Sequence, residues 1–248
     1  GKGGKENLLY FDGGFGGATK SIKNALENAG VKIITNTPVT KIISKDGKVT
    51  GVETKDGTFD SSCVLATLPL PTFLDITPEL PKSYTEPARE IRFLGNVCLV
   101  LSLNKSLSST YWLNVADPSF PFVGVIEHTN FDPPSNYGGK HIAYLSKYLP
   151  TSEPLFNLSD EETFKYCLPH LKRIFPEFNE SWVNGYNIWR AHYSQPVITK
   201  HYSKLIPAEK TPIKGLWLST MAQVYPEDRG TSYAVRHGRK VAQKIIQG

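Results

Sequence analysis

The stretch VTKIISKDGKVTGVETKDGTFD, residues 39–60, decides the fold. It contains two Asp-Gly pairs, at 46–47 and 56–57, and each pair is flanked by β-branched or alternating residues. Asp-Gly loops favour tight turns whose twist matches that of a hairpin. The stretch therefore predicts a three-stranded antiparallel meander over residues 39–59.

The segments on either side of the meander predict a helix and two strands. Residues 18–30, ATKSIKNALENAG, place apolar side chains on one helical face and end at Gly30, a common helix stop. That face is made of Ile22, Ala25, Leu26 and Ala29. VKIITN, residues 31–36, reads as a strand. CVLA, residues 63–66, is nearly all apolar, which is typical of a buried strand in a parallel sheet.

The middle of the chain predicts an antiparallel sheet with a covering helix, an α+β layer. The helix follows a capping box formed by Ser159 and Glu162, and its apolar residues recur at helical spacing. The expected strands are GNVCLVLSLN (95–104), PFVGVIEHTNF (121–131), HIAYLSKYL (141–149) and VNGYNIWRAHYSQP (183–196).

Composition describes a globular chain of 248 residues, with 40% hydrophobic and 21% charged residues. The net charge of +5 comes from scattered lysines, so we expect no nucleic-acid surface. No apolar run approaches ~20 residues, so we expect no membrane span. Cys63, Cys98 and Cys167 lie far apart, which predicts buried, reduced thiols and a cytoplasmic protein. The six histidines lack metal-ligand spacing, so we expect no metal.

The glycine-rich run YFDGGFGGATKS, residues 10–21, does not fit a phosphate-binding loop. A dinucleotide fingerprint needs G-x-G-x-x-G between a strand and a helix. Counted from Gly14, the third glycine position holds Thr19, and counted from Gly13 the second holds Phe15. The run predicts instead a tightly packed turn at the N-terminus of a helix.

The order of these elements resembles the flavin-dependent amine oxidase superfamily, especially its protoporphyrinogen-oxidase-like and phytoene-desaturase-like branch. The early matches are the Gly13-Gly14 turn, the Pro38-Val39 strand start with Ile42, and the Ala66-Thr67-x-Pro69 strand end. The strongest match is GLWLSTMAQVYPEDRGTSYAVRHGRKVAQKI, residues 215–245. That run has a final strand, a loop and a helix that, in the family, begins beside the flavin.

The resemblance implies a mixed α/β and α+β fold that binds FAD. Residues 1–85 and 205–248 would form part of a Rossmann-like FAD-binding domain, and 86–204 a substrate-binding domain. Helix amides carry partial positive charge, so those of Tyr233 and Ala234, after a cap at Thr231 or Ser232, would stabilise reduced flavin. The implied FAD contacts are Gly13, Gly14, Val39, Ala66, Thr67, Trp217, Met221, Arg229, Gly230, Thr231, Tyr233 and Ala234.

Two departures from the family pattern matter. Ser219, Thr220 and Met221 replace the usual Ala-Gly-acid run, and no G-x-G-x-x-G occurs anywhere in the chain. Since phosphate binding in this fold uses that first glycine turn, we expect little FAD affinity in this chain alone. The resemblance covers only the family's second half. We therefore expect a fragment that is inactive until joined to an N-terminal FAD-binding half.

No catalytic residue can be named, but four residues are candidate substrate contacts. Glu127 and His128 end an apolar strand, which indicates either the rim of a substrate cleft or a strand end with hydrogen-bonded side chains. Arg190 and His192 share one side of an extended strand, where they could meet an anionic substrate group or form a solvated face.

The expected function is oxidation of a small apolar or cyclic substrate by hydride transfer to FAD. One alternative is a flavin isomerase of the UDP-galactopyranose mutase type, which would need arginines such as Arg190 and Arg229 to converge on a diphosphate. The other is a non-catalytic binding domain of the same fold.

Overall fold

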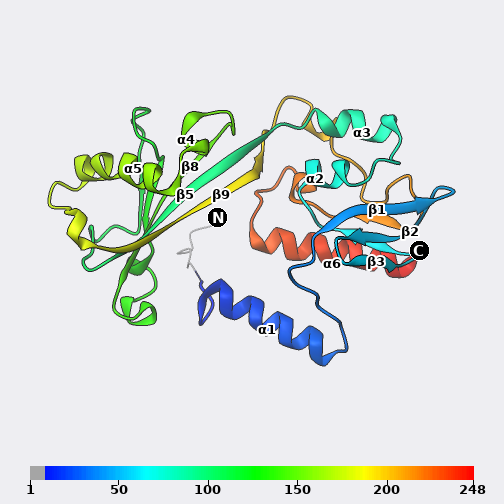
Figure 1. The fold of residues 1–248 in the computed structure, drawn as a ribbon, viewed down its shortest axis with the longest axis horizontal. Helices are drawn as coiled ribbons and strands as arrows, with labels where there is room; N and C mark the ends of the chain where they lie inside the picture. Colours follow the sequence, from blue (N-terminus) through cyan, green and yellow to red (C-terminus); the bar gives the residue numbers. More distant parts are fainter. Residues whose placement is uncertain (1–8) are drawn as a thin grey trace, which may run out of the picture. The chain divides into compact units, whose positions relative to one another are not determined.

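The computed structural model describes residues 9–248 and divides the chain into two compact units (Figure 1). The first unit holds the described residues up to Thr35 together with 96–190, and the second holds 36–95 and 191–248. These units do not follow the expected functional boundaries, since residues 9–35 group with the middle of the chain. Which unit binds cofactor and which binds substrate stays a prediction.

The first unit is built on a five-stranded sheet with the order β6-β7-β8-β5-β9. Adjacent strands β6, β7 and β8 are antiparallel, as predicted. β5 and β9 are long and continue into the second unit. The strand bounds are β5 Phe93–Leu103, β6 Trp112–Asn114, β7 Gly124–Glu127, β8 His141–Leu149 and β9 Val183–Pro196.

Helix α5, Asp160–Ile174, packs on this sheet and closes the core of the unit. Its N-terminus carries the predicted capping box, in which Ser159 Oγ accepts from the Glu162 amide and Glu162 accepts from the Ser159 amide. The core joins the apolar side of β5 to the apolar stripe of α5. The stripe is Phe164, Cys167, Leu168 and Leu171, all buried. The short elements are α4 Pro154–Asn157, η1 His128–Asn130, η2 Pro134–Tyr137 and η3 Glu180–Trp182.

Helix α1, Gly14–Asn28, begins four residues earlier than expected and buries none of its residues. Gly13 precedes it with φ of 72°, a left-handed conformation that favours glycine. Ile22 and Leu26, on the predicted apolar face, are 59% and 42% exposed. The strand predicted over 31–36 is wrong, because no described strand lies beside that segment to pair with it.

The second unit contains the predicted meander, which is confirmed. Strands β1 Val39–Lys45, β2 Lys48–Thr54 and β3 Gly57–Asp60 pair antiparallel in that order. Asp46 and Gly47 both have positive φ, 49° and 71°, as a tight hairpin turn requires.

A parallel pair of short strands lies at the centre of this unit. β4, Val64–Ala66, pairs with β10, Leu216–Leu218, which is completely buried. Gly215 permits this approach, because its φ is 81° and a Cβ there would lie 2.2 Å from the Ser62 carbonyl oxygen. A strand in a parallel sheet was predicted here, although its partner was not, and Leu65 of β4 is 37% exposed, so the expected full burial of this strand is wrong.

The rest of the unit packs around that pair. α2 Leu70–Asp75, α3 Lys82–Arg89, η4 Tyr202–Lys204 and η5 Met221–Gln223 surround a core that includes Ile42, Phe73 and Tyr202. The predicted C-terminal helix is present as α6, Thr231–Gln247, which includes the residue expected to precede it and buries only Val241.

Two sequence-level expectations concern cysteines and membranes. All three cysteines are free, but Cys63 is exposed and only Cys167 is buried, so the expectation of three buried thiols is wrong. Over residues 9–248, none of the helices combines the length and the apolar character that crossing a bilayer requires.

Candidate functional site

A hollow of about 520 Å³ opens in the first unit where the Gly13-Gly14 turn enters α1. The turn itself forms one side, and the others are formed by Asp132, which follows η1, and by residues of η2 and β8. Its polar and aromatic lining includes Tyr10, Asp12, Asp132, Asn136, Tyr137 and Tyr144. A Cβ on Gly14 would come within 3.1 Å of the Tyr10 hydroxyl, so glycine keeps this turn close to the ring.

His128, a predicted substrate contact, packs against two residues that line this hollow. Its ring lies 5.0 Å from that of Tyr10 and 5.9 Å from that of Tyr144, both edge-on. The side chain is buried, and burial lowers the pKa of its imidazole below the usual value, against a weaker opposing effect of Asp132. The ring is therefore neutral at pH 7.

A chain of short hydrogen bonds connects His128 to the hollow. Its Nε2 lies 2.6 Å from the Tyr137 hydroxyl, which donates to Asp132 Oδ2 at 2.7 Å. Since the single hydroxyl proton goes to the carboxylate, His128 Nε2 is the donor to Tyr137. Asn136 donates to the other carboxylate oxygen at 2.8 Å. The Asp132 carboxylate is thus held in one orientation.

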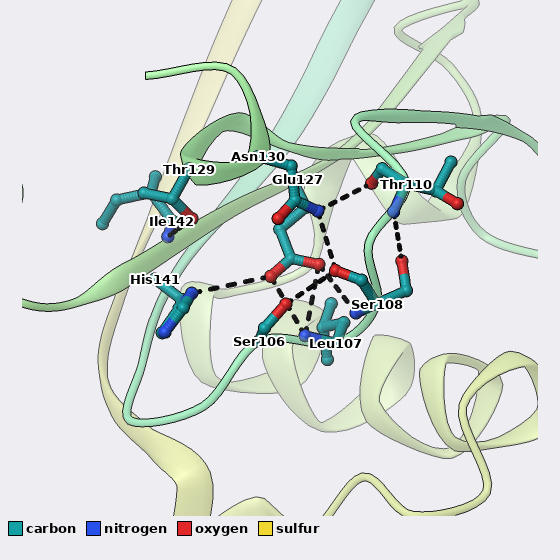
Figure 2. Close-up of polar contacts among 9 residues, drawn as sticks. All are labelled: Ser106, Leu107, Ser108, Thr110, Glu127, Thr129, Asn130, His141 and Ile142. Atoms are coloured by element: carbon teal, nitrogen blue, oxygen red, sulfur yellow. Dashed lines mark hydrogen bonds and ion pairs between the residues drawn. The ribbon is translucent and has the colours of Figure 1, made fainter. Parts of the chain in front are cut away.

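Glu127, the other predicted substrate contact at this strand end, instead binds backbone amides of a neighbouring loop (Figure 2). It is 1% exposed, and its carboxylate accepts from the backbone amides of Leu107 and Ser108 at 2.9 to 3.2 Å. His141 Nδ1 lies 3.8 Å away. These contacts fix the loop after β5. They correspond to the interpretation of a hydrogen-bonded strand end rather than a cleft rim.

The next two residues behave like Glu127. Thr129 Oγ1 accepts from the Ile142 amide at 3.1 Å, and Asn130 donates to the carbonyls of Ser108 and Thr110 at 2.8 and 3.1 Å (Figure 2). His128 differs from these neighbours because its hydrogen-bond partner, Tyr137, lines the hollow.

Arg190, predicted to meet a substrate anion, is engaged within its own unit. Its guanidinium donates to Asp160 Oδ1 at 2.6 Å, to the Leu158 carbonyl at 2.7 Å and to Thr163 Oγ1 at 3.0 Å. These bonds fasten β9 to the start of α5. His192, two residues on, is exposed, with its ring 6.4 Å from that of Tyr193. Its role as a substrate contact stays a prediction.

In the second unit, the start of α6 collects five of the predicted FAD contacts, Arg229 to Ala234. The expected cap at Thr231 or Ser232 is wrong, because Gly230 is the N-cap and no described side chain caps the helix. The amides of Tyr233 and Ala234 both donate to the Gly230 carbonyl at 3.1 Å. The amides that remain for a ligand are therefore those of the first two helical residues.

Charged groups hold this helix in place. Arg229 Nε donates to Gln195 Oε1 at 2.8 Å. Farther along, Lys240 and Lys244 converge on the largely buried Glu209. Burial raises the pKa of that carboxyl, but the hydrogen bonds and charges of the two lysines outweigh burial and lower it overall. Glu209 therefore stays ionised and anchors the basic face of α6.

The remaining predicted FAD contacts lie apart. Trp217 is buried beside a separate hollow of about 670 Å³, together with Lys244 and the end of α6, so it is at the opposite end of that helix from Tyr233. Ala66, at the end of β4, accepts from the Ser219 amide at 2.9 Å. The other three are Val39 at the start of β1, Thr67 exposed after β4, and Met221 opening η5.

Sequence reasoning missed Tyr137, Asp132 and Tyr144. They belong to no motif, and they meet only because β8 returns beside β7 and brings η2 over the glycine turn. Tyr10 was visible in the glycine-rich run but carried no signal of its own.

A family model described as flavin containing amine oxidoreductase matches residues 2–246. Among curated proteins, none matches. Solved structures similar to the chain include an oxidoreductase from Methanosarcina mazei, with 22% identity, a TM-score of 0.70, and coverage of 92% of this chain and 55% of that one. A protein described as a protoporphyrinogen oxidase from Exiguobacterium has 16% identity, a TM-score of 0.70 and coverage of 92% and 51%.

Reduced UDP-galactopyranose mutase has 12% identity, a TM-score of 0.74 and coverage of 96% and 52%. At these identities the likeness shows the fold alone. The chain spans about half the length of each of these structures.

Proposed function

Because the chain belongs to the flavin-containing amine oxidoreductase family, we propose that it forms the second half of an FAD-dependent oxidoreductase. The family resemblance seen in the sequence is confirmed, as is a mixed α/β fold with antiparallel sheets. The proposed reaction is oxidation of a small molecule, in which FAD accepts the hydride. The chain would be inactive until a partner half supplies the dinucleotide-binding turn.

The observation that carries this proposal is the uncapped start of α6. A helix N-terminus without a side-chain cap has free amides and a partial positive charge. Gly230 as N-cap leaves those amides open, and Arg229 beside it adds a full charge. This arrangement fits the anionic ring of a reduced flavin. The other contacts would come from the exposed Thr67 and from Met221, while Trp217, at the far end of α6, fits the ring less well than predicted.

Uncovered apolar surface in each unit supports a missing partner half. In the first unit, Ile22 and Leu26 of α1 are exposed. In the second, Leu65 of β4 is 37% exposed and Val235 of α6 is 56% exposed. β4 pairs only with β10 in the described structure, so its other edge is open to a further strand. A dinucleotide-binding half is the partner that the family implies.

The alternative of a sugar-moving isomerase gains no support from the arginines. The Nη1 and Nη2 groups of Arg190 donate to Asp160, Leu158 and Thr163, and Arg229 donates to Gln195. Neither lines the hollow at Gly13-Gly14. The similarity to the mutase therefore remains one of fold.

The test is to join this chain to a segment carrying a strand, G-x-G-x-x-G and a helix, taken from the sequence encoded upstream. We expect a yellow protein with the visible absorption bands of oxidised flavin. Arg229→Gln should lower the flavin reduction potential by about 30 mV, equivalent to ~1.4 kcal/mol for a two-electron couple, because reduced flavin loses a neighbouring positive charge.

The matched control is Arg239→Gln, an exposed residue of the same helix, which should leave the potential unchanged. A well-folded but colourless joined protein would instead favour the non-catalytic binding domain.

A further inference from the structure

The turn that forms one side of the hollow can act as a hinge. Gly13 and Gly14 follow one another with φ of 72° and 68°, left-handed conformations that glycine adopts at little cost. Helix α1, which begins at this turn, buries none of its residues. The chain therefore has a permissive backbone joint here, followed by a helix that little packing holds in place.

Tyr10, just before the turn, attaches this segment to the rest of the first unit. Its ring lies edge-on to those of His128 and Phe131, with centroids 5.0 and 5.9 Å away. Its hydroxyl also shares a hydrogen bond with Tyr137. Because the single proton of the Tyr137 hydroxyl goes to Asp132, the Tyr10 hydroxyl is the donor in this bond. One side chain thus joins the turn to the opposite wall of the hollow.

We propose that residues 9–14 form a lid over the hollow, which is hinged at Gly13-Gly14 and held closed by Tyr10 among the rings around His128. Residues of the lid and of the start of α1 line one side of the hollow, and residues between 132 and 144 line the other, so a swing of the lid opens it. Lid and hollow both belong to the first unit. The lid therefore goes beyond the proposed flavin chemistry and does not depend on it.

His128 makes the lid sensitive to pH. The Tyr10 ring packs against this imidazole, and burial lowers the imidazole pKa below its usual value, against a weaker opposing effect of Asp132. A base whose pKa is lower with the lid closed binds a proton more tightly with the lid open. The closed lid is therefore favoured above the usual histidine pKa of about 6.5 and is weakened as the pH falls below it.

The other titratable groups that face His128 come from the lid, η2, β8 and the residue after η1. They are Tyr10, Tyr137, Tyr144 and Asp132. Among these residue types and histidine, only histidine ordinarily changes charge between pH 5.5 and 7.5. His141, beside Glu127, is another imidazole of the same unit, so the experiment includes a variant that removes His128 alone.

The experiment compares Tyr10→Ala with Phe11→Ala in the purified chain. Phe11 is the matched control, because it is an aromatic residue of the same lid, is 51% exposed and is not among the described residues that line the hollow. Amide hydrogen exchange of residues 10–17 at pH 7.5 reports how often the lid opens. Tyr10→Ala should speed this exchange about three- to tenfold, because it loses the ring contacts, and Phe11→Ala should change it less than about twofold.

A second measurement separates loss of the Tyr10 contact from a general loss of stability. Tyr10→Ala should raise the pKa of His128 toward its usual value, because the ring that covers the imidazole is gone, whereas Phe11→Ala should leave that pKa unchanged. Carbon-13 NMR of labelled histidine follows the titration.

The pH dependence is measured on the unmodified chain. Exchange of residues 10–17, corrected for the intrinsic rate, should be faster at pH 5.5 than at pH 7.5. His128→Gln removes the titrating group and should abolish that difference.

Equal acceleration of exchange by Tyr10→Ala and Phe11→Ala, or none by either, would overturn the lid. An unchanged His128 pKa in Tyr10→Ala, or a pH effect that persists in His128→Gln, would overturn the role of His128. Should Tyr10→Ala fail to fold, Tyr10→Leu keeps an apolar side chain, removes the ring and the hydroxyl, and should change both measurements in the same direction. Failure here leaves the flavin assignment standing if the joined protein is yellow.

Discussion

Helices α1 and α5 have the same length, 15 residues, and each was predicted from an apolar stripe, but they meet different surroundings. α5 lies on the sheet of the first unit, where Leu171 is fully buried and Phe164 stacks on Tyr186 with ring centroids 4.0 Å apart. α1 buries none of its residues. Periodicity therefore predicts that a helix forms, but it does not say what the helix packs against.

The same contrast exists at the helix termini. α5 satisfies its first amides with its own capping box, whereas α6 begins at Gly230 without a side-chain cap. A helix that serves only packing gains from closing its end. A helix that presents its amides to a ligand gains from leaving that end open. α1 leaves its apolar face exposed and α6 leaves its first amides without a side-chain cap, and these are the surfaces that the proposed partner half would cover.

The largest expected effect comes from truncating the buried stripe. Leu171→Ala should lower the free energy of unfolding by about 2–5 kcal/mol, because it removes a fully buried side chain and leaves a cavity. Leu26→Ala, at an equivalent apolar position of α1, should change it by less than about 0.5 kcal/mol, because Leu26 is 42% exposed. Urea unfolding of the purified chain, followed by circular dichroism, measures both.

The pair also tests whether α1 lacks a partner. Similar losses in the two variants would mean that α1 packs against something in the isolated chain, such as a second copy. Once the chain is joined to its proposed partner half, Leu26→Ala should become destabilising while the effect of Leu171→Ala stays the same.

A smaller effect separates the two helix termini. Ser159→Ala should cost about 1 kcal/mol, because the capping box loses the hydroxyl that accepts from Glu162. Thr231→Ala, at the first position of α6, should be close to neutral, since its hydroxyl caps nothing. Thermal and denaturant unfolding of the two variants give the comparison. A comparable loss in Thr231→Ala would show that α6 is capped in solution.

Much of the fold follows from local signals. The meander could be predicted from its two Asp-Gly turns, and α5 could be predicted from its capping box and its stripe of apolar residues. The failed strand over 31–36 had the right residues, but a strand requires a neighbour to pair with. Cys63 shows the same limit of local signals: its sequence neighbours include apolar residues, but its side chain is exposed in the folded chain.

The candidate site was less predictable than the fold. Gly13, Gly14 and His128 could be singled out because turns and polar strand ends have recognisable patterns. Asp132, Tyr137 and Tyr144 could not, since hairpin pairing of β7 with β8 brings them there. The role predicted for Arg190 ignored Asp160, which lies thirty residues earlier and takes up its charge.

The smallest effect concerns the open end of α6. Gly230 has φ of −105°, and within residues 9–248 no neighbouring atom lies within 4 Å of the place that a Cβ would take, so a side chain fits there without strain. Gly230→Ser should raise the free energy of unfolding by a few tenths of a kcal/mol, because the hydroxyl can accept from the free amides, whereas Gly230→Ala should lower it slightly. In the joined protein the serine should weaken flavin binding, since it competes for the same amides. Equal stability of the serine and alanine variants would mean that a side chain at position 230 cannot reach those amides. The backbone geometry at the start of α6, and not an end kept open for a ligand, would then explain why α6 lacks the side-chain cap that α5 has.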